Sequence, residues 1–397
     1  MNVIVEPEKC CACRACVQVC HKKAIDVVND IYGYETIRID ESLCVDCGAC
    51  KKVCPMLNEF KSKVHLECGS AYAKDFDTKY NGSSGGLFGT FAKYMIENNG
   101  IVYAAAFDEE LHLRTSRADS IEGIQPLLKS KYLLCDTSGV FGSIKSDLDN
   151  GKNVLYTSSP CQIAALKGFL KKDYENLICV EFVCHGVGSQ KQFYDSLHYI
   201  EQKRNIEIKK FSFREKIKKA SSQYFYHYCY RDKRSGKVEF KDKRDIYMTF
   251  PYYFAYEERL NCRDSCYHCV YATEERVGDI TIGDFHSIIK YEPEIDRFAG
   301  VSMFVVNTTK GQLFFDQLSD RLNVKLYDWE IIRINNRFNG FEEPPRRRQD
   351  YLKLLADNNM DEAVKKFLRY KTDWRWYYYH LPKFVRNAGN KLLRRSE

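Results

Sequence analysis

The sequence has no uninterrupted apolar run of about eighteen residues, the length that a helix needs to cross a bilayer. Its first residues, from Met1 to Pro7, lack the basic run and apolar stretch of an export signal, so we expect a cytoplasmic protein. It also lacks solenoid repeats, low-complexity tracts and base-reading motifs, and we therefore expect no nucleic-acid partner. What remains is a globular protein whose chemistry must be read from its side chains.

Cysteine, by contrast, is plentiful, since 18 of the 397 residues are cysteine. In a reducing cytoplasm, so many thiols indicate metal ligation rather than disulfides. A chain of this length is expected to form two or three domains and to bury a sizeable core.

Two cysteine runs near the amino terminus have the same spacing, Cys-x-x-Cys-x-x-Cys-x-x-x-Cys. This spacing is typical of bacterial ferredoxins that carry two 4Fe–4S clusters. In such proteins the first three thiolates of a run bind one cluster and the fourth binds the other. The spacing therefore predicts one cluster held by Cys10, Cys13, Cys16 and Cys54, and a second held by Cys20, Cys44, Cys47 and Cys50.

Other interpretations of the two runs fit less well. A zinc ribbon uses four ligands in two pairs, and a disulfide framework needs an oxidising compartment. His21 stands where the first run of a ferredoxin usually has proline, whereas Pro55 keeps that position in the second run. The proline is not a ligand, so the cluster assignment is unaffected. Cys11 is left over, and we interpret it as a packed or exposed thiol rather than a ligand.

The rest of the chain alternates strands and helices, which predicts an α/β core with at least one parallel pair of strands. We expect helices at residues 87–97, 140–148, 161–170, 190–201 and 312–318. We expect strands at residues 37–39, 101–107, 153–156, 177–183, 208–213, 224–230, 278–282 and 301–306. The predicted fold class is therefore α+β/α/β: a bacterial-type ferredoxin at 1–60, an α/β flavin-binding-like core with a mixed sheet at 70–320, and a helical tail at 341–397. The core is expected to have parts at about 70–150 and 151–320.

Two serine-containing loops precede predicted helices and could hold a phosphate. Backbone N–H groups at a helix start and nearby hydroxyls bind such groups, and a lysine could add positive charge. Plain helix capping is the alternative for each loop. A flavin would suit this place because it converts single electrons from clusters into pairs. The residues that we assign to FAD are Ser83, Ser84, Gly85, Gly86, Lys131, Ser158, Ser159 and Cys161.

Three further cysteines lie close together in the spacing Cys-x-x-x-Cys-x-x-Cys, namely Cys262, Cys266 and Cys269. They predict a third 4Fe–4S cluster, with Cys184 as the best fourth ligand and Cys161 as the next. Cys161 could instead be a reactive thiol at a helix start, or simply buried. Zinc with His268 or His185 is an alternative. Radical S-adenosylmethionine enzymes share the spacing, but only Val270–Glu397 follows it here, too little for their barrel.

The net charge of +7 is unevenly placed. From Arg346 to Glu397 there are fourteen Lys and Arg residues against six Asp and Glu residues, interleaved with aromatic side chains such as Trp374. Such a segment could lie on an anionic membrane surface or contact nucleic acid. The alternative is a tail helix that packs on its own protein with solvated arginines.

Seven motifs occur in an order that resembles one family: Ser83-Ser84-Gly85-Gly86-Leu87-Phe88, Ser130-Lys131-Tyr132, Ser159-Pro160-Cys161-Gln162, Cys184-His185-Gly186-Val187-Gly188-Ser189, Phe213-Arg214-Glu215-Lys216, the stretch 262–269, and Arg276-Val277-Gly278-Asp279-Ile280-Thr281-Ile282-Gly283-Asp284-Phe285. From about Met1 to Leu318 the chain resembles the coenzyme F420 hydrogenase/dehydrogenase beta-subunit family, fused to a ferredoxin. The resemblance implies an iron–sulfur flavoprotein that binds FAD beside a cluster. It also implies a role beside polysaccharide biosynthesis, where bacterial members often belong. His286 stands where the family usually has tryptophan, which bears on the substrate face.

The order of the motifs predicts a chain of carriers. A redox donor protein or reduced carrier would load the two amino-terminal clusters, a third cluster would relay, and FAD would pass electron pairs to a small-molecule acceptor. Lys131, Arg214 and Lys216 are predicted to contact anionic groups, unless they are ordinary surface charges. Asp279 and Asp284 could act on a proton or on ribose hydroxyls.

Two other classes of function remain open. One is a non-enzymatic electron relay or redox-sensing subunit, which would need no flavin. The other is a cell-envelope assembly factor held to the membrane by its basic tail.

Overall fold

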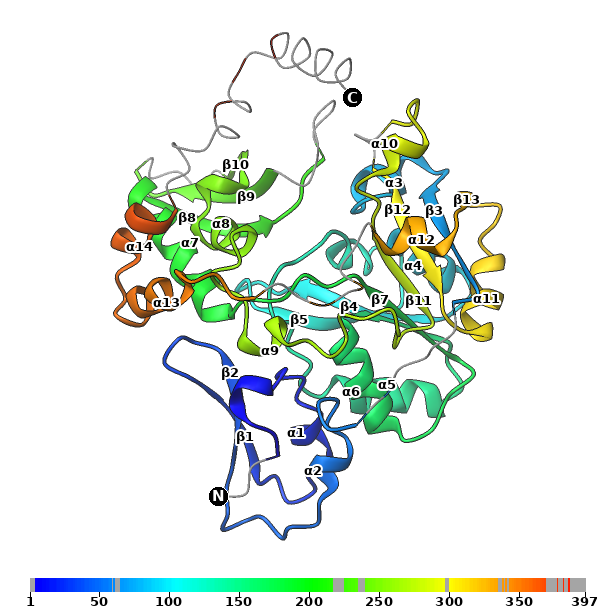
Figure 1. The fold of residues 1–397 in the computed structure, drawn as a ribbon, viewed down its shortest axis with the longest axis horizontal. Coiled ribbons are helices and arrows are strands. Elements are labelled where there is room, and N and C mark those ends of the chain that lie inside the picture. The colour runs from blue at the N-terminus through cyan, green and yellow to red at the C-terminus, as the bar shows by residue number, and fades with distance from the viewer. Residues whose placement is uncertain are drawn as a thin grey trace.

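The structure is a computed structural model that describes residues 4–58, 60, 65–216, 225–234, 240–296, 300–334, 338, 340, 343–368, 377, 381 and 385. Figure 1 shows a small amino-terminal unit in dark blue, a large central sheet with helices, and an aromatic-rich module that carries the last described helices. No helix of the described residues is long and apolar enough to cross a membrane.

The amino-terminal unit, which we call the ferredoxin unit, is built from two short helices and a hairpin. Its elements are η1 (Pro7–Lys9), α1 (Ala15–Val19), β1 (Ile25–Asn29), β2 (Glu35–Ile39) and α2 (Ala49–Lys52), and β1 pairs with β2 antiparallel. The two cysteine runs repeat one backbone shape. Ala12 and Arg14 in the first run, and Asp46 and Gly48 in the second, all have left-handed φ angles between 50° and 70°. The sequence repeat is thus also a conformational repeat.

The central sheet has eight strands in the order β13-β3-β12-β11-β7-β6-β4-β5. Their bounds are β3 (Glu67–Ala73), β4 (Ile101–Phe107), β5 (Leu113–Ala118), β6 (Val154–Ser158), β7 (Leu177–Phe182), β11 (Ile280–Asp284), β12 (Ser302–Val306) and β13 (Leu322–Leu326). Strands β4, β6, β7 and β11 are mutually parallel, whereas β11–β12, β12–β3, β3–β13 and β4–β5 pair antiparallel. The sheet is therefore mixed, as expected, and its parallel centre is flanked by antiparallel edges.

Helices cover both faces of the parallel centre. The helices around the sheet are α3 (Phe76–Asn81), α4 (Leu87–Glu97), η2 (Gln125–Leu127), α5 (Val140–Asp149), α6 (Pro160–Leu170), α9 (Asp264–Tyr267), α10 (Ile288–Tyr291), α11 (Thr309–Asp316) and α12 (Trp329–Arg333). In β4, Val102 and Ala104 face the core formed with α4 and α11, while Ile101 and Tyr103 face the core formed with α5 and α6. This alternation is what a strand buried on both sides produces.

The aromatic-rich module stands beside the sheet. It contains α7 (Gln190–Arg204), β8 (Ile206–Ser212), β9 (Phe225–Asp232), β10 (Phe240–Ile246), η4 (Tyr247–Thr249), α8 (Pro251–Glu257), α13 (Arg348–Ala356) and α14 (Met360–Phe367). Strands β8, β9 and β10 form an antiparallel sheet. Phe193 on α7 sits at its centre, with ring centroids 5.2 Å from Phe211 and 5.6 Å from Phe213. Aromatic pairs at these separations add to the stability gained from burial.

Most predicted elements are present with shifted ends. The helix expected at 190–201 continues to Arg204, and the strand expected at 278–282 begins at Ile280 and ends at Asp284. The first residue of the strand expected at 224–230 lies outside the described residues. Of the tail expected at 341–397, α13 and α14 are described, whereas Trp374 and most of the basic aromatic segment are not.

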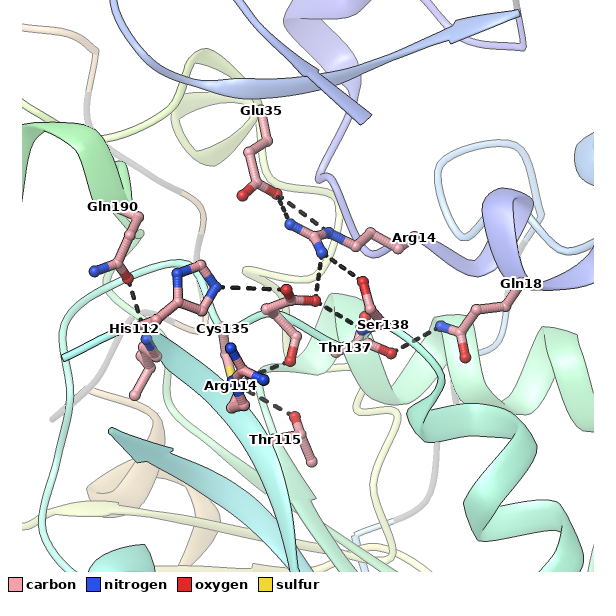
Figure 2. A network of polar contacts seen from close by, with 12 residues as sticks. Arg14, Gln18, Glu35, His112, Arg114, Thr115, Cys135, Thr137, Ser138 and Gln190 are labelled. Atoms are coloured by element: carbon pink, nitrogen blue, oxygen red, sulfur yellow. Dashed lines mark hydrogen bonds and ion pairs between the residues drawn. The ribbon is translucent and has the colours of Figure 1, made fainter. Parts of the chain in front are cut away.

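The central sheet and the helices around it form what we call the sheet domain. A polar network centred on Arg14 fixes the ferredoxin unit to this domain (Figure 2). Arg14 Nη2 lies 2.6 Å from Glu35 Oε2, and Nη1 donates to Ser138 Oγ at 2.5 Å. Nη1 also forms an ion pair with Asp136, whose second oxygen lies 3.4 Å from His112 Nε2. Arg14 is 9% exposed, so its charge is neutralised away from water by carboxylates of both units.

Other contacts across this junction reach the backbone beside the cluster cysteines. Thr137 Oγ1 donates to Cys13 O at 2.8 Å, and the Tyr271 hydroxyl donates to Pro55 O. Cys13 and Val53 also join the apolar core that α5 and α6 form against the sheet. The cysteine runs are therefore held in place by the domain that they pack against.

We expect Arg14→Met to lower the free energy of unfolding by about 3 kcal/mol, because it leaves two part-buried carboxylates without their cation. Urea denaturation of the full chain and hydrogen exchange at α1 and α5 measure the effect. Arg38→Met is the matched control: Arg38 pairs with Asp26 while both are more than half exposed, and it should change stability by less than about 0.5 kcal/mol. Equal losses in the two variants would contradict a role for the Arg14 network in docking.

Candidate functional site

A cavity of about 270 Å³ opens at the carboxyl ends of the parallel strands. Cys161 follows β6, Cys184 and His185 follow β7, and Asp284 and His286 end or follow β11; all five line it. In open α/β sheets this edge is where ligands bind. The cavity also brings together the predicted residues Ser83, Ser84, Gly86, Lys131, Ser158 and Ser159.

The loop before α4 is a rigid backbone cradle. Ser84 Oγ donates to Val301 O at 2.7 Å, and Gly85 N donates to Ser302 Oγ at 2.9 Å. Gly86 has a left-handed φ of 81°, and a Cβ there would lie 2.9 Å from Thr78 O. Gly85 is not part of the cavity wall, and it permits the close approach of β3. The two glycines thus shape the loop, while Ser83, Ser84 and Gly86 face the cavity.

Two lysines, the buried Lys216 and the half-buried Lys131, support this wall of the cavity. Lys216 donates to Ser84 O at 2.7 Å and to Lys79 O, and burial lowers its pKa to about 7. Lys131 donates to three carbonyl oxygens, at 2.7 Å to Leu128, 2.9 Å to Leu127 and 3.0 Å to Pro126. Burial also lowers the pKa of Lys131 to about 7. Because its three N–H donors are engaged, Lys131 can act on a ligand through charge rather than by a direct hydrogen bond.

Arg214 and Asp284 form a buried ion pair on the cavity wall. Arg214 Nη1 lies 2.9 Å from Asp284 Oδ2, and Nη2 lies 3.4 Å from Oδ1. Burial alone would raise the pKa of Asp284, but the Arg214 guanidinium and then His286 hold it well below its usual value. Arg214 Nε has no hydrogen-bond partner in the part of the chain that the structure describes. This wall therefore offers a cation with one free donor.

Asp279, in contrast, lies at the opposite end of β11 and has a structural role. Its Oδ2 accepts from Cys179 N at 2.8 Å, and its Oδ1 accepts from Thr308 Oγ1 at 2.8 Å. It is buried and does not line the cavity. Both carboxylate oxygens thus tie neighbouring segments together.

The loop before α6 forms another side of the cavity. Ser159 is the N-cap residue and Pro160 the first helical residue, as expected, but the Ser159 side chain makes no capping hydrogen bond. Its Oγ lies 3.4 Å from Cys161 Sγ instead. Ser158 Oγ donates to Gln162 Oε1 at 2.6 Å, and Gln162 Nε2 donates to Cys135 O at 2.7 Å. The Ser159 hydroxyl is thus the one of this pair that faces the thiols.

The predicted ligands of the first cluster are gathered inside the ferredoxin unit. Cys10, Cys16 and Cys54 share one buried core, and Cys13 is also buried. Burial, followed by the nearby thiols of Cys10 and Cys54, raises the pKa of Cys16 to about 12. A bound metal would displace these protons, because thiolates rather than thiols are the ligands.

The predicted ligands of the second cluster surround a separate space. Cys20, Cys44, Cys47 and Cys50 all line a cavity of about 40 Å³. Cys47 is exposed and the other three are half-buried, in contrast to the four buried thiols of the first set. The second set is therefore the outer one.

A third group of thiols gathers at the main cavity. Burial raises the pKa of Cys184 well above its usual value, and the thiols of Cys266, Cys161 and Cys269 add to this in that order. All four line the cavity. Cys262 is fully buried outside the lining, with Sγ 3.9 Å from His185 O.

Among the described residues, no three His, Cys, Asp or Glu side chains converge around one metal ion.

Cys11 connects the ferredoxin unit with this cavity, which the sequence did not reveal. It is buried, it lines the cavity, and it belongs with Cys13 to the apolar core against which Cys161 packs, so that the neighbouring thiols of Cys13 and Cys161 have the largest effects on its pKa, which is raised well above its usual value. A ligand predicted for the first cluster and a thiol of the third group are thus separated by one side chain.

A buried ion pair fixes the segment that follows Cys269. Glu181 and Arg276 are both almost completely buried and paired, and Glu181 Oε2 accepts from Val277 N at 3.2 Å and Gly278 N at 3.1 Å. Arg276 Nη1 donates to Tyr271 O at 3.2 Å. The pair was not singled out from the sequence, because neither residue differs there from a surface charge.

The family comparisons agree with the cysteine spacing and with the ordered motifs. Residues 9–57 match the 4Fe-4S dicluster domain, and residues 151–330 match the C terminus of the coenzyme F420 hydrogenase/dehydrogenase beta subunit.

One curated relative is the coenzyme F420-dependent sulfite reductase of Methanocaldococcus jannaschii, which is 25% identical over 227 residues. The match covers 53% of this chain and 35% of the relative, so the chain spans about a third of that protein's length. A chain in the structure of the xenon-derivatized F420-reducing [NiFe] hydrogenase complex from Methanosarcina barkeri has 16% identity and a TM-score of 0.42. That match covers 78% of this chain and 92% of the other.

We expect Gly86→Ala to destabilise the protein by about 1–3 kcal/mol, because alanine is strained at a left-handed φ and its Cβ would meet Thr78 O. Urea denaturation is the measurement. Gly142→Ala is the control: Gly142 lies in α5 with open space around its Cβ position, and alanine there should be neutral or stabilising by up to about 1 kcal/mol. Equal changes in the free energy of unfolding of the two variants would contradict the role of Gly86 in shaping this loop.

Proposed function

Because the chain joins a 4Fe-4S dicluster domain to the C-terminal domain of the coenzyme F420 hydrogenase/dehydrogenase beta subunit, we propose that it is an iron–sulfur flavoprotein oxidoreductase. Electrons pass in this proposal from the outer cluster to the inner one, across Cys11 to a third cluster, and then to an acceptor in the cavity. The observation that carries it is the placement of Cys11 against both Cys13 and Cys161.

The burial of the thiols supports this direction of flow. The exposed Cys47 makes the second cluster the accessible one, and Leu43, Val45 and Leu57 are exposed apolar side chains of the same unit. Together they suit the docking of a redox donor protein or a reduced carrier. The first cluster lies deeper, against the sheet domain, and so is the intermediate stage.

The third cluster is proposed to bind Cys184, Cys266 and Cys269, with Cys161 as the fourth ligand. These four thiols line one cavity, whereas Cys262 lies behind Gly186, where an added Cβ would be 2.9 Å from Cys262 Sγ. Cys262 therefore becomes the alternative fourth ligand. The Glu181–Arg276 pair supports the site by holding the chain just beyond Cys269.

FAD is proposed for the remainder of the cavity, where it would supply the conversion of single electrons into pairs. The N–H groups at the starts of α4 and α6, together with the hydroxyls of Ser83 and Ser159, provide donors for its phosphates. The Ser84 hydroxyl already donates to Val301 O. The charges of Lys131 and Lys216 and the free Nε of Arg214 complement an anion. The volume of about 270 Å³ lies near the lower end of ligand pockets, so part of FAD would project from it.

The acceptor is proposed to be a small molecule that takes two electrons beside His185 and His286. Burial, followed by the charge of His286, lowers the pKa of His185 to about 4, so His185 is neutral at pH 7 and can offer an N–H donor. Coenzyme F420 and sulfite are acceptor classes suggested by the relative's name. A role in polysaccharide biosynthesis rests on the family resemblance alone.

Iron, sulfide and flavin counts on anaerobically purified protein test the proposal. We expect three 4Fe–4S clusters and bound FAD. Iron without flavin would instead favour the non-enzymatic electron relay.

We expect Cys161→Ser, Cys184→Ser, Cys266→Ser and Cys269→Ser each to lose about a third of the iron, because each removes one thiolate of the third cluster. Cys262→Ser should keep all of it. Iron analysis and EPR of the dithionite-reduced protein are the measurements. Full iron in Cys161→Ser with loss in Cys262→Ser would reverse the assignment of the fourth ligand.

A further inference from the structure

Arg263 is a buried guanidinium where the ferredoxin unit, the cavity and the loop between Cys262 and Cys266 meet. It is 4% exposed and lines the cavity. Its Nη2 donates to Cys10 O at 2.8 Å and to Glu35 O at 2.7 Å. Its Nε and Nη1 are buried and have no hydrogen-bond partner among the described residues.

Within the part of the chain that the structure describes, no carboxylate pairs with the charge of Arg263. The other four buried arginines each pair with a carboxylate: Arg14 with Glu35 and Asp136, Arg214 with Asp284, Arg276 with Glu181, and Arg348 with Asp264. Arg263 forms no ion pair within the described ranges. Its guanidinium makes a cation–π contact with the Tyr34 ring, whose centroid lies 5.9 Å from Cζ. A buried cation is expected to have an anionic partner, because water no longer solvates it.

Thiols of the third group line the same cavity as this charge, and Cys266 lies three residues after it in the chain. The guanidinium lies close enough to Cys161 and Cys266 to oppose the rise in pKa that burial and neighbouring thiols cause at both. With a 4Fe–4S cluster bound by four thiolates, this place would carry a net negative charge near Nε and Nη1, which have no hydrogen-bond partner among the described residues. Charge and hydrogen bonds to sulfur are two of the properties that set the reduction potential of a cluster.

We propose that Arg263 is the counter-ion of the third cluster and raises its reduction potential through Nε–H and Nη1–H hydrogen bonds to sulfur. This inference rests on the proposed function, because it requires a cluster at Cys161, Cys184, Cys266 and Cys269. Reduction adds one electron to the cluster, and the fixed positive charge favours that more negative state. A higher potential at the third cluster favours the transfer of electrons toward the cavity.

The same side chain also positions the first cluster relative to the third. Its Nη2 donates to the carbonyl of Cys10, a predicted ligand of the first cluster, while its Nε and Nη1 have no partner among the described residues and the side chain lines the cavity together with Cys161 and Cys266. Lysine could keep the charge but not both functions, because it lacks the planar fork of five donors. Arg263 is thus a positioning residue as well as a counter-ion.

The test is an EPR-monitored redox titration of the full-length, anaerobically prepared protein. Arg263→Gln should lower the reduction potential of the third cluster, changing its equilibrium with the donor about tenfold, or ~59 mV for one electron. Arg263→Lys should lower it by less, because the charge remains. The second cluster is the internal reference and should not move.

Arg348→Gln is the matched control. Arg348 is also buried, and it donates to Cys262 O at 2.8 Å, but it already has Asp264 as its partner. An equal shift in Arg348→Gln would show that the potential follows the fold of this loop, and would overturn the role of Arg263.

The remaining outcomes separate the two proposals. A third cluster that is present but keeps its potential in Arg263→Gln overturns the inference and leaves the proposed function intact. Wild-type protein with iron for only two clusters overturns both. If Arg263→Gln does not fold, Arg263→Lys decides, and an unchanged potential in that variant overturns the inference.

Discussion

The docking of the ferredoxin unit against α5 and α6 is the constraint on which the rest of the structure depends. Arg14 lies between carboxylates of both units, and Thr137 and Arg263 hold the carbonyls of Cys13 and Cys10. These bonds engage the backbone of the residues that are predicted to bind the first cluster. In the proposed chain of electron carriers, the separation between the members would be set by the same atoms that join the two units.

The sequence was informative wherever spacing determines geometry. Eight cysteines in two equal runs predicted the ferredoxin unit, and the repeat of left-handed residues at Arg14 and Gly48 is the conformational basis of that repeat. Alternation of buried segments predicted the parallel strands, since a strand covered on both faces is apolar throughout. Serine and glycine before α4 predicted a loop that leads into a helix, and Gly86 is the N-cap residue, with a left-handed φ and no side-chain capping hydrogen bond.

Other parts of the site depend on tertiary partners that spacing does not reveal. Lys131 is a residue type that commonly binds phosphate, but three backbone carbonyls of the segment before it accept its hydrogen bonds. Asp279 lies just before β11 and Asp284 ends it, yet only Asp284 lines the cavity. Cys11 had no place in the ferredoxin pattern, and its position against Cys161 emerges only when the two units meet. The contacts of these residues are determined by the tertiary structure rather than by their neighbours in sequence.

The two sets of predicted cluster ligands differ in burial, and this difference has a consequence for oxidation of the protein by air. Cys47 faces water, whereas the thiols of Cys10 and Cys13 are shielded by the sheet domain. Dissolved oxidants therefore meet the outermost site first, and exposed thiolates are the most readily oxidised. Oxidation would begin at Cys47 and would stop the proposed entry of electrons at the second cluster while the buried thiols remain unmodified. The outer site would thus be oxidised before the more deeply buried thiols are reached.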